Sequence, residues 1–430
     1  MKGEIIAIGN ELTSGRIANT TSGFAARQLF EAGYEIHAMH TIGDSPSLIG
    51  EALKRAIDSV DFVIVTGGLG ATDDDLTNEA VSMALNRPTM PNLEILSLIR
   101  AHLDEISGSP VSPLEKLAWL PVGAEALNPK GRMAGYQLVH DNKPVFFLPG
   151  IPRQMEQLLI DHVLPRLATW YPGPRLSTCR RLFKIFDMSE MEVNSRIATL
   201  NLADDVAIGY YPVFPEVHLS LIIRDVRGNN PEPLFQNACA VVDTILGDAV
   251  YGHDQESMEL VVGSLLKSSG RTVAMAESCT GGLISHKITT IPGSSEYFLG
   301  GVTAYANSMK ITYLNVDQSL IETHGAVSEE VARAMAEGIR TRTGADIGLS
   351  VTGIAGPDGG TPERPVGTVF FGLVTADFCR VLQFRFSGSR DQIQEIAAFT
   401  GMNLVRKYLL NKNSRTKGKL DQLHQLAALG

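Results

Sequence analysis

The sequence predicts an α/β protein built from more than one domain, and three observations support that prediction. In the first and last thirds of the chain, short apolar strands alternate with amphipathic helices, which is typical of parallel sheets with helices on both faces. The middle of the chain has shorter elements of a different texture. A chain of 430 residues is also long enough for about two to three domains of ordinary size.

The composition is that of a globular protein, with 44% apolar residues, 20% charged residues and a formal net charge of −10. This acidic balance argues against a broad surface for direct contact with nucleic acid or membrane. The basic cluster of the chain lies near the C-terminus and consists of Lys412, Arg415, Lys417 and Lys419. We interpret it as a solubilising tail.

The sequence favours a cytoplasmic protein. The apolar run Ile5–Ile8 is too short for a signal core, and no apolar run reaches the roughly 18 residues of a membrane-spanning helix. The four cysteines lie far apart and form no CxxC pair. That pattern suits a reducing compartment and gives no support to a structural zinc site.

The N-terminal third is predicted to form a strand, two helices and two further strands. Ile5–Ile8 is the first strand, and residues 24–32 and 48–57 carry apolar side chains at helical spacing. Phe62–Val65 and Val145–Leu148 are apolar at every position, as expected for strands covered on both faces. We therefore expect a parallel sheet between two layers of helices.

The middle segment begins after a cluster of breakers, Tyr171–Pro174. We predict a strand around Leu182–Phe186, a polar helix around Glu190–Leu200, a strand at Val217–Ile223 and a helix at Phe235–Leu246. These elements suffice for a small α+β module. They include no group of residues that suggests chemistry.

The C-terminal third returns to the alternation of strands and helices. We predict a helix near Ser257–Lys267, strands at Val273–Ala276 and Ile347–Val351, and a closing helix with apolar residues from Ile393 to Leu404. Ser328 is expected to cap a further helix, because two acidic residues follow it in the first turn.

A turn of small residues, Glu277–Gly282, follows the strand Val273–Ala276, and a helix is predicted directly after it. Ser278 is thereby placed at the positive end of a helix. Free backbone N–H groups there can hold a phosphate or stabilise an oxyanion beside a nucleophile. Alternatively, Ser278 and Thr280 only cap the helix, and the glycines serve the turn.

Two more loops rich in glycine and hydroxyl groups follow strand ends in this domain. They are Gly300–Asn307, which leads to Lys310, and Thr352–Thr361. In an open α/β sheet, ligands bind outside the carboxyl ends of the strands. We therefore expect the three loops to converge on one site.

With these residues the chain resembles the CinA family of competence/damage-inducible proteins, in particular their nicotinamide mononucleotide (NMN) amidohydrolase domain. The matching segments occur in the family's order and are Ala276–Gly282 (AESCTGG), Pro292–Ser295, Tyr305-x-Asn307-x-x-Lys310, Gly325–Ser328, Thr352–Pro357 and Pro365–Val369. The resemblance covers essentially the full chain. It implies a three-layer αβα fold for this domain and hydrolysis of NMN to nicotinic acid mononucleotide and ammonia, without a metal or other cofactor.

The resemblance also implies roles for individual residues. Ser278 would attack the carboxamide or position the attack, and Lys310 would act as the base and then as proton donor to the leaving ammonia. Tyr305 would help to orient this pair, and Arg390 would bind charge near the substrate. The implied substrate-binding residues are Glu277, Thr280, Gly281, Gly282, Asn307, Thr352, Gly353, Ile354, Ala355 and Gly356.

Lys310 can accept a proton only when its amine is neutral. To be half neutral at pH 7, the amine needs a pKa of about 7 in place of its ordinary value of about 10.4. That difference corresponds to ~4.6 kcal/mol. Burial or a neighbouring cation can supply a change of that size. The alternatives are a solvated lysine and a lysine that only binds phosphate.

Three positions depart from the family pattern around this site. Ala306 stands in place of a serine, Ser389 in place of an aspartate and Gln394 in place of a basic residue. We expect these changes to affect substrate affinity more than the chemistry, because Ser278 and Lys310 are both present.

The loop Thr66–Asp75 follows the strand Phe62–Val65 and combines glycines with three consecutive carboxylates. Glycines allow a backbone to approach a phosphate closely, and clustered carboxylates suit a divalent cation. Alternatively, Asp75 caps the helix that follows, but capping needs one carboxylate and not three. Metal or nucleotide binding is therefore the preferred interpretation.

This N-terminal region resembles the molybdopterin-binding-like domain of CinA proteins, a three-layer αβα fold for which ADP-ribose pyrophosphatase activity is implied. Gly9–Leu12, Gly15, Gly43–Asp44 and Pro149–Pro152 also match. The resemblance implies a nucleotide site formed by Glu11, Thr66, Gly67, Gly68, Gly70 and Thr72, and a divalent metal (cobalt, magnesium or manganese) at Asp74 and Asp75.

Departures are heavier in this domain. The replaced positions are Ala71 for a proline, Thr21 for an asparagine, Leu117 for a glutamine, Gln154 for a glutamate and Arg132–Met133 for a Thr-Ala pair. Two of these changes remove polar or charged groups that could contact a substrate. We therefore expect ADP-ribose hydrolysis to be weak or absent.

The predicted domains are 1–170 (molybdopterin-binding-like), 175–252 (small α+β), 255–412 (NMN amidohydrolase) and a tail, 413–430. The resemblance implies a homodimer whose ligands are small nucleotides, NMN and ADP-ribose. Two other functions stay open. One is a pterin-binding module with a passenger domain, and the other is a non-catalytic scaffold for DNA uptake or recombination.

Overall fold

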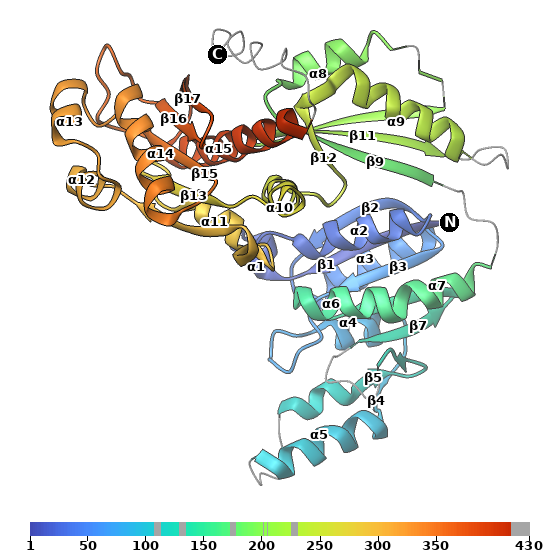
Figure 1. The fold of residues 1–430 in the computed structure, drawn as a ribbon. Coiled ribbons are helices and arrows are strands. Elements are labelled where there is room, and N and C mark those ends of the chain that lie inside the picture. The colour runs from blue at the N-terminus through green and yellow to red at the C-terminus, as the bar shows by residue number, and fades with distance from the viewer. Residues whose placement is uncertain are drawn as a thin grey trace. The chain divides into compact units, whose positions relative to one another are not determined.

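The computed structural model describes residues 1–106, 113–128, 135–172, 178–200, 202–203, 205–224 and 231–413 (Figure 1). The chain forms two compact units, Met1–Thr178 with Asp225–Asn230, and Cys179–Arg224 with Pro231–Gly430. Most of the predicted basic tail and the pair Arg132–Met133 lie outside the described residues.

The first unit is built around a six-stranded sheet. Its strands in spatial order are β2 (Glu35–Ile42), β1 (Lys2–Ile8), β3 (Phe62–Thr66), β8 (Lys143–Leu148), β7 (Tyr136–His140) and β6 (Glu125–Ala126). The first four are parallel, but β7 and β6 are antiparallel to their neighbours. The prediction of an all-parallel sheet is therefore wrong at the edge formed by β7 and β6. Asp141 and Asn142, with φ of 50° and 59°, form a two-residue turn that leads from β7 directly into β8.

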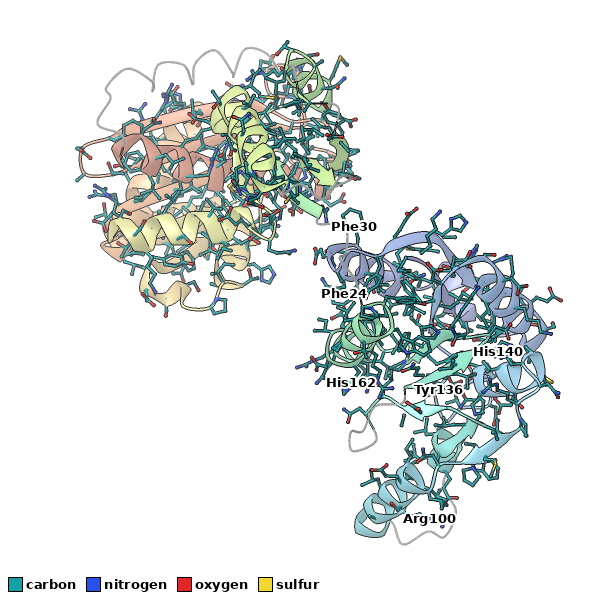
Figure 2. All side chains as sticks on the ribbon, turned by 90° about the vertical axis from the view of Figure 1, so that its right-hand side faces the viewer. Phe24, Phe30, Arg100, Tyr136, His140 and His162 are labelled. Carbon is teal, nitrogen blue, oxygen red and sulfur yellow. The ribbon has the colours of Figure 1, made fainter. Side chains whose placement is uncertain are left out.

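Helices cover both faces of this sheet. They are α1 (Asn10–Thr13), α2 (Thr20–Glu31), α3 (Pro46–Ser59), α4 (Thr77–Ala84), α6 (Pro152–Leu158), η2 (Leu159–Val163) and α7 (Leu164–Trp170). The segment after α4 adds α5 (Leu93–Ile106), η1 (Pro113–Ala118) and a short ribbon of β4 (Thr89–Pro91) and β5 (Trp119–Pro121), which pack on one another and, through the ribbon, on α4. Ile6 packs on the face of α3 and α4, whereas Ile5 packs on the face of α2 and α6. Tyr136 of β7, labelled in Figure 2, is buried. Its ring stacks on that of Phe147 in β8. The predicted layers of helix, sheet and helix are confirmed.

The second unit begins with a small α+β module. Its elements are β9 (Thr178–Ile185), α8 (Glu190–Ile197), β10 (Val206–Val213), β11 (Glu216–Arg224), α9 (Glu232–Leu246), η3 (Gly247–Ala249) and β12 (Val250–His253). The strands form one sheet in the order β10-β11-β9-β12. The sequence analysis predicted β9, α8, β11 and α9 but missed β10 and β12.

A five-stranded sheet forms the centre of the rest of this unit. In spatial order its strands are β14 (Phe298–Thr303), β13 (Val273–Glu277), β15 (Ile347–Gly353), β16 (Thr368–Val374) and β17 (Cys379–Arg385). The first three are parallel, and β16 and β17 are antiparallel. The helices are α10 (Met258–Ser269), α11 (Leu283–Thr289), η4 (Ser294–Glu296), α12 (Asn307–Leu314), α13 (Gln318–His324), α14 (Glu329–Thr343) and α15 (Arg390–Asn413). Ser328 caps α14 as predicted, because its side chain accepts the N–H of Val331.

Helix α15 ties the small module to the five-stranded domain. Asn403 and Lys407 both donate to Oδ2 of Asp187, at 2.7 and 2.5 Å. Arg406, which is buried in the same helix, donates to the carbonyl oxygen of Asp248 at 2.5 Å. These contacts explain why both parts belong to one compact unit. Among the described helices, none has the length and apolar character needed to cross a membrane.

Candidate active site

Ser278 lies where strand β13 passes into helix α11. Its backbone N–H donates to the carbonyl oxygen of Val351 in the neighbouring strand β15, at 2.9 Å. Gly281 and Gly282, with φ of 64° and 99°, then turn the chain into α11. The Ser278 side chain is thereby fixed at the carboxyl end of the parallel strands and is only 7% exposed.

Lys310 reaches Ser278 from the second turn of α12. Its amine lies 3.0 Å from Ser278 Oγ, 2.7 Å from the carbonyl oxygen of Ala304 and 3.3 Å from that of Tyr305. Lys310 is 1% exposed. Burial lowers its pKa to about 8. The alternative interpretation of Lys310 as a solvent-exposed lysine is therefore wrong.

The N-terminus of α11 is not free to bind a ligand, which corrects one expectation from the sequence. The buried carboxylate of Glu277 accepts the backbone N–H groups of Gly282, Ile284 and Ser285 at 2.8 to 3.1 Å. It also accepts the hydroxyl groups of Thr280 and Ser285. Glu277 is thus the cap of the helix, and the N–H groups of Gly282, Ile284 and Ser285 are not available to a phosphate or an oxyanion.

Three of the predicted substrate-binding side chains are buried: Glu277, Thr280 and Thr352. Glu277 and Thr280 bond to each other inside the turn. Thr352 is completely buried, and its hydroxyl donates to the carbonyl oxygen of Ala326. Their polar atoms therefore bond to groups of the protein. The positions with exposed or partly exposed surface are Gly281, Gly282, Asn307, Gly353 and Ile354, whereas Ala355 and Gly356 are buried.

Arg390, the first residue of α15, connects two of the three loops. Its Nη1 donates to the carbonyl oxygen of Gly356 at 2.6 Å, and its Nη2 donates to the Tyr305 hydroxyl at 2.8 Å. Tyr305 is 59% exposed. Together with the contact between Lys310 and Ser278, this brings the three predicted loops to one place.

Two contributors to this site were not found from the sequence. The carbonyl oxygens of Ala304 and Tyr305 hold the Lys310 amine, but backbone carbonyls leave no signal in a sequence. Gln394 was noted only as a departure from the family pattern. Its side-chain amide donates to the carbonyl oxygen of Cys279 at 2.8 Å.

The N-terminal loop after β3 is held in a tight turn. Gly67 and Gly68 have φ of 101° and 66°, and a Cβ on Gly67 would lie 2.2 Å from the carbonyl oxygen of Ile8. Thr77 donates its hydroxyl to the carbonyl oxygen of Gly67. Asp75 does not cap α4, because its carboxylate instead accepts the N–H and the hydroxyl of Thr72.

Four carboxylates interact electrostatically near this loop. Burial raises the pKa of Asp44, and the charges of Glu11, Asp74 and Asp75 raise it further. Asp44 received no role in the sequence analysis, although Gly43–Asp44 was among the matching segments. Nevertheless, within the described ranges no three or more His, Cys, Asp or Glu side chains are arranged to hold a metal ion.

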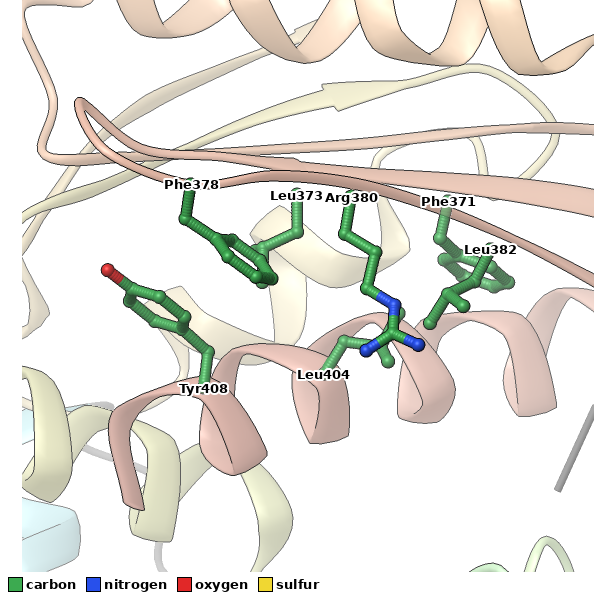
Figure 3. Close-up of a pocket in the computed structure, with 7 residues that line it drawn as sticks. All are labelled: Phe371, Leu373, Phe378, Arg380, Leu382, Leu404 and Tyr408. Atoms are coloured by element: carbon green, nitrogen blue, oxygen red, sulfur yellow. The ribbon is translucent and has the colours of Figure 1, made fainter. Parts of the chain in front are cut away.

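Two other hollows lie away from these loops. A cavity of about 20 Å³ is lined by Phe371, Leu373, Phe378, Arg380, Leu382, Leu404 and Tyr408 (Figure 3). It has room for about one water molecule. An open groove of about 510 Å³ lies between α9 and the residues that lead from α8 into β10, among them Leu200, Leu202 and Val206. Neither contains a residue of the two predicted sites.

Comparison with known proteins gives matches along most of the chain. Residues 255–409 match the family described as CinA C-terminal domain, residues 4–169 the family described as probable molybdopterin binding domain, and residues 180–252 the family described as damage-inducible protein CinA KH domain. A CinA-like protein of Desulfotalea psychrophila is 61% identical over 407 residues, which cover 95% of this chain and 98% of the relative. One from Citrifermentans bemidjiense is 39% identical over 415 residues, covering 96% and 99%.

Solved structures also match part of the chain. A CinA superfamily protein from Klebsiella pneumoniae is 28% identical, with 36% of this chain and 99% of that chain covered and a TM-score of 0.35. The competence/damage-inducible protein CihA from Agrobacterium tumefaciens is 35% identical, with 36% and 93% covered and a TM-score of 0.34.

Proposed function

The chain belongs to the CinA family, and from its C-terminal site we propose that it hydrolyses the carboxamide of NMN to give nicotinic acid mononucleotide and ammonia. One observation supports this proposal most strongly. The buried amine of Lys310 lies 3.0 Å from the hydroxyl oxygen of Ser278, and its pKa is lowered to about 8. At pH 7 about a tenth of such an amine is neutral and can accept a proton.

The surroundings of Lys310 suit the neutral form. A neutral amine has two N–H donors and one lone pair. Two of the three oxygens around Lys310 Nζ are carbonyl oxygens, which can only accept a hydrogen bond. If these take the two N–H groups, the lone pair is left for the hydroxyl proton of Ser278. This is the arrangement that a general base requires.

The proposed reaction proceeds through an ester on the serine. Ser278 Oγ attacks the carboxamide carbon while its proton passes to Lys310 Nζ. Lys310 returns the proton to the amide nitrogen, the C–N bond breaks, and ammonia leaves. Water then attacks the ester and gives a proton to Lys310, which passes it to Ser278 Oγ as the ester bond breaks. The products are the carboxylic acid and the free serine, and no metal or cofactor enters these steps.

Arg390 and Tyr305 are assigned to substrate binding. Arg390 holds the loop that contains Gly356 and the Tyr305 hydroxyl at the same time. We propose that its charge attracts the phosphate of the nucleotide, and that the exposed Tyr305 ring contacts the substrate beside Ser278. The capped N-terminus of α11 supports this assignment, because the N–H groups of Gly282, Ile284 and Ser285 already bond to Glu277 and not to a phosphate.

Ammonia release tests the proposal directly. The full chain incubated with NMN, without added metal, should release ammonia and nicotinic acid mononucleotide. Ser278→Ala should lower turnover by several orders of magnitude, because it removes the nucleophile. The pterin-binding and scaffold alternatives both predict no ammonia from the wild type. Ammonia release from Ser278→Ala near the wild-type rate would exclude Ser278 from the mechanism.

For the N-terminal unit we propose nucleotide binding at the loop after β3, with ADP-ribose hydrolysis weak or absent. The glycine turn at Gly67 and Gly68 supports the first part, because glycines allow a backbone to approach a phosphate closely. The carboxylate of Asp75 accepts two hydrogen bonds from Thr72, which supports the expectation of weak or absent hydrolysis. Since the described carboxylates do not form a metal-binding group, we derive no metal-dependent step.

A further inference from the structure

Gln394 links helix α15 to the residue that follows the proposed nucleophile. It lies four positions after Arg390, so both side chains project from the same face of the helix. Arg390 contacts two of the site loops, and Gln394 reaches the third through the carbonyl oxygen of Cys279, at 2.8 Å. The start of α15 therefore touches all three loops that form the site.

The bond from Gln394 restrains the backbone directly after Ser278. Peptide units are planar, so holding the carbonyl oxygen of Cys279 fixes the orientation of the whole peptide between Cys279 and Thr280. In hydrolases with a serine on a strand-to-helix turn, the N–H of the residue after the serine stabilises the oxyanion. Cys279 occupies that position here. A small rotation of this turn would therefore change both the direction of Ser278 and that of its nearest backbone donor.

We propose that Gln394 is a positioning residue for the Ser278 site, which rests on the proposed amidohydrolase function. It acts through the Cys279 carbonyl and does not touch the substrate. The fold does not depend on this bond, because α15 is also joined to α11 by the ion pair of Glu395 with Lys287 at 2.6 Å. Ile393 and Ala397 on the adjacent face are buried in the core. Loss of the Gln394 bond should thus disturb the turn but leave the helix in place.

The test compares three variants of the full chain. Gln394→Met has a similar length but no N–H donor, and its kcat for NMN should fall about three- to tenfold, the effect of one hydrogen bond. Its KM should change less than twofold. Gln394→Lys keeps a donor and should recover most of the wild-type kcat. The control Glu395→Gln removes the neighbouring ion pair without touching Cys279 and should keep wild-type kcat.

A second measurement separates this inference from the substrate assignment. Acylation of Ser278 by a small activated ester, followed by intact mass, does not require NMN to be the substrate. Gln394→Met should slow that acylation by a similar factor, and Gln394→Lys should restore it. Acylation at the wild-type rate in Gln394→Met, or an equal loss in Gln394→Lys, would overturn the inference. A wild type that is acylated at Ser278 but releases no ammonia from NMN would refute only the proposed substrate.

Discussion

At the scale of single residues, Lys310 carries the most specific expectation. The proposed base must be neutral, and burial brings its pKa to about 8. The value of kcat/KM for NMN should therefore rise with pH and level off above an apparent pKa near 8. Lys310→Met should lose most of the turnover with little change in KM. A raised KM with unchanged kcat would show instead that Lys310 only binds phosphate.

The same residue links stability to pH. Below pH 8 the amine is protonated in both the folded and the unfolded chain. Burial of the charge then lowers the free energy of unfolding by its full amount. Between pH 8 and about 10.5 the folded chain loses the proton while the unfolded chain keeps it, so wild-type stability rises with pH. Relative to Lys310→Met, the free energy of unfolding should increase by about 3 kcal/mol across this window. Chemical denaturation at pH 7.5 and pH 10 measures most of this change. If the free energies of unfolding of the wild type and Lys310→Met differed by the same amount at both pH values, the pKa of Lys310 would not be lowered in the folded chain.

The family resemblance pointed to Ser278 and Lys310, but neither it nor the residue pattern predicted the capping role of Glu277. The sequence places a carboxylate beside the serine, and either a substrate or a helix end could use it. Only the backbone path decides, because the turn through Gly281 and Gly282 brings the start of α11 back onto Glu277. Gln394 was missed for a similar reason, since its partner is a backbone oxygen 115 positions away.

At the scale of secondary structure elements, the Glu277 cap sets the position of α11. Glu277→Gln keeps the shape but replaces one acceptor oxygen by a donor, so at least one of the N–H groups of Ile284 and Ser285 loses its partner. We expect a loss of about 1–3 kcal/mol in the free energy of unfolding. Urea denaturation measures it, and Ser285→Ala, which removes only one hydroxyl donor, should cost less. Equal stability of Glu277→Gln and wild type would mean that the carboxylate does not cap the helix.

Several elements that bury a regular face were predicted, but the fully buried inner strand β16 and the exposed edge strand β10 were both missed. All five residues of β3 are buried, and the apolar face of α14 is buried from Val331 to Ile339. By contrast, β10 contains Gly209 and Pro212, lies at the edge of its sheet and has no fully buried residue. Its sequence therefore lacks the apolar pattern on which the prediction depended.

At the scale of the whole molecule, the chain combines two sites of unequal completeness. In the C-terminal site the side chains proposed for catalysis are in contact, and burial has already adjusted the pKa of Lys310. In the N-terminal site the glycine turn is formed, but Asp75 is bonded within its own loop. Lys116 donates to the carbonyl oxygens of Thr72 and Asp75, which further ties this loop down. The second activity should therefore be much the weaker of the two.

The full chain carrying Ser278→Ala isolates the N-terminal activity, because the C-terminal site is then silent. With ADP-ribose and cobalt, magnesium or manganese, we expect little or no AMP. Hydrolysis requires the pyrophosphate to be held in line with an attacking water. Gln154, where the family pattern has a glutamate, retains the shape but has no charge and cannot accept a proton, and Leu117 offers no polar group. Restoring both as Gln154→Glu with Leu117→Gln should increase AMP formation, whereas adding Asp74→Asn to that variant should remove the gain. The expectation is wrong if the unrestored chain forms AMP at about 1 s⁻¹ or faster, a rate typical of enzymes, and loses it on Asp74→Asn or Asp75→Asn.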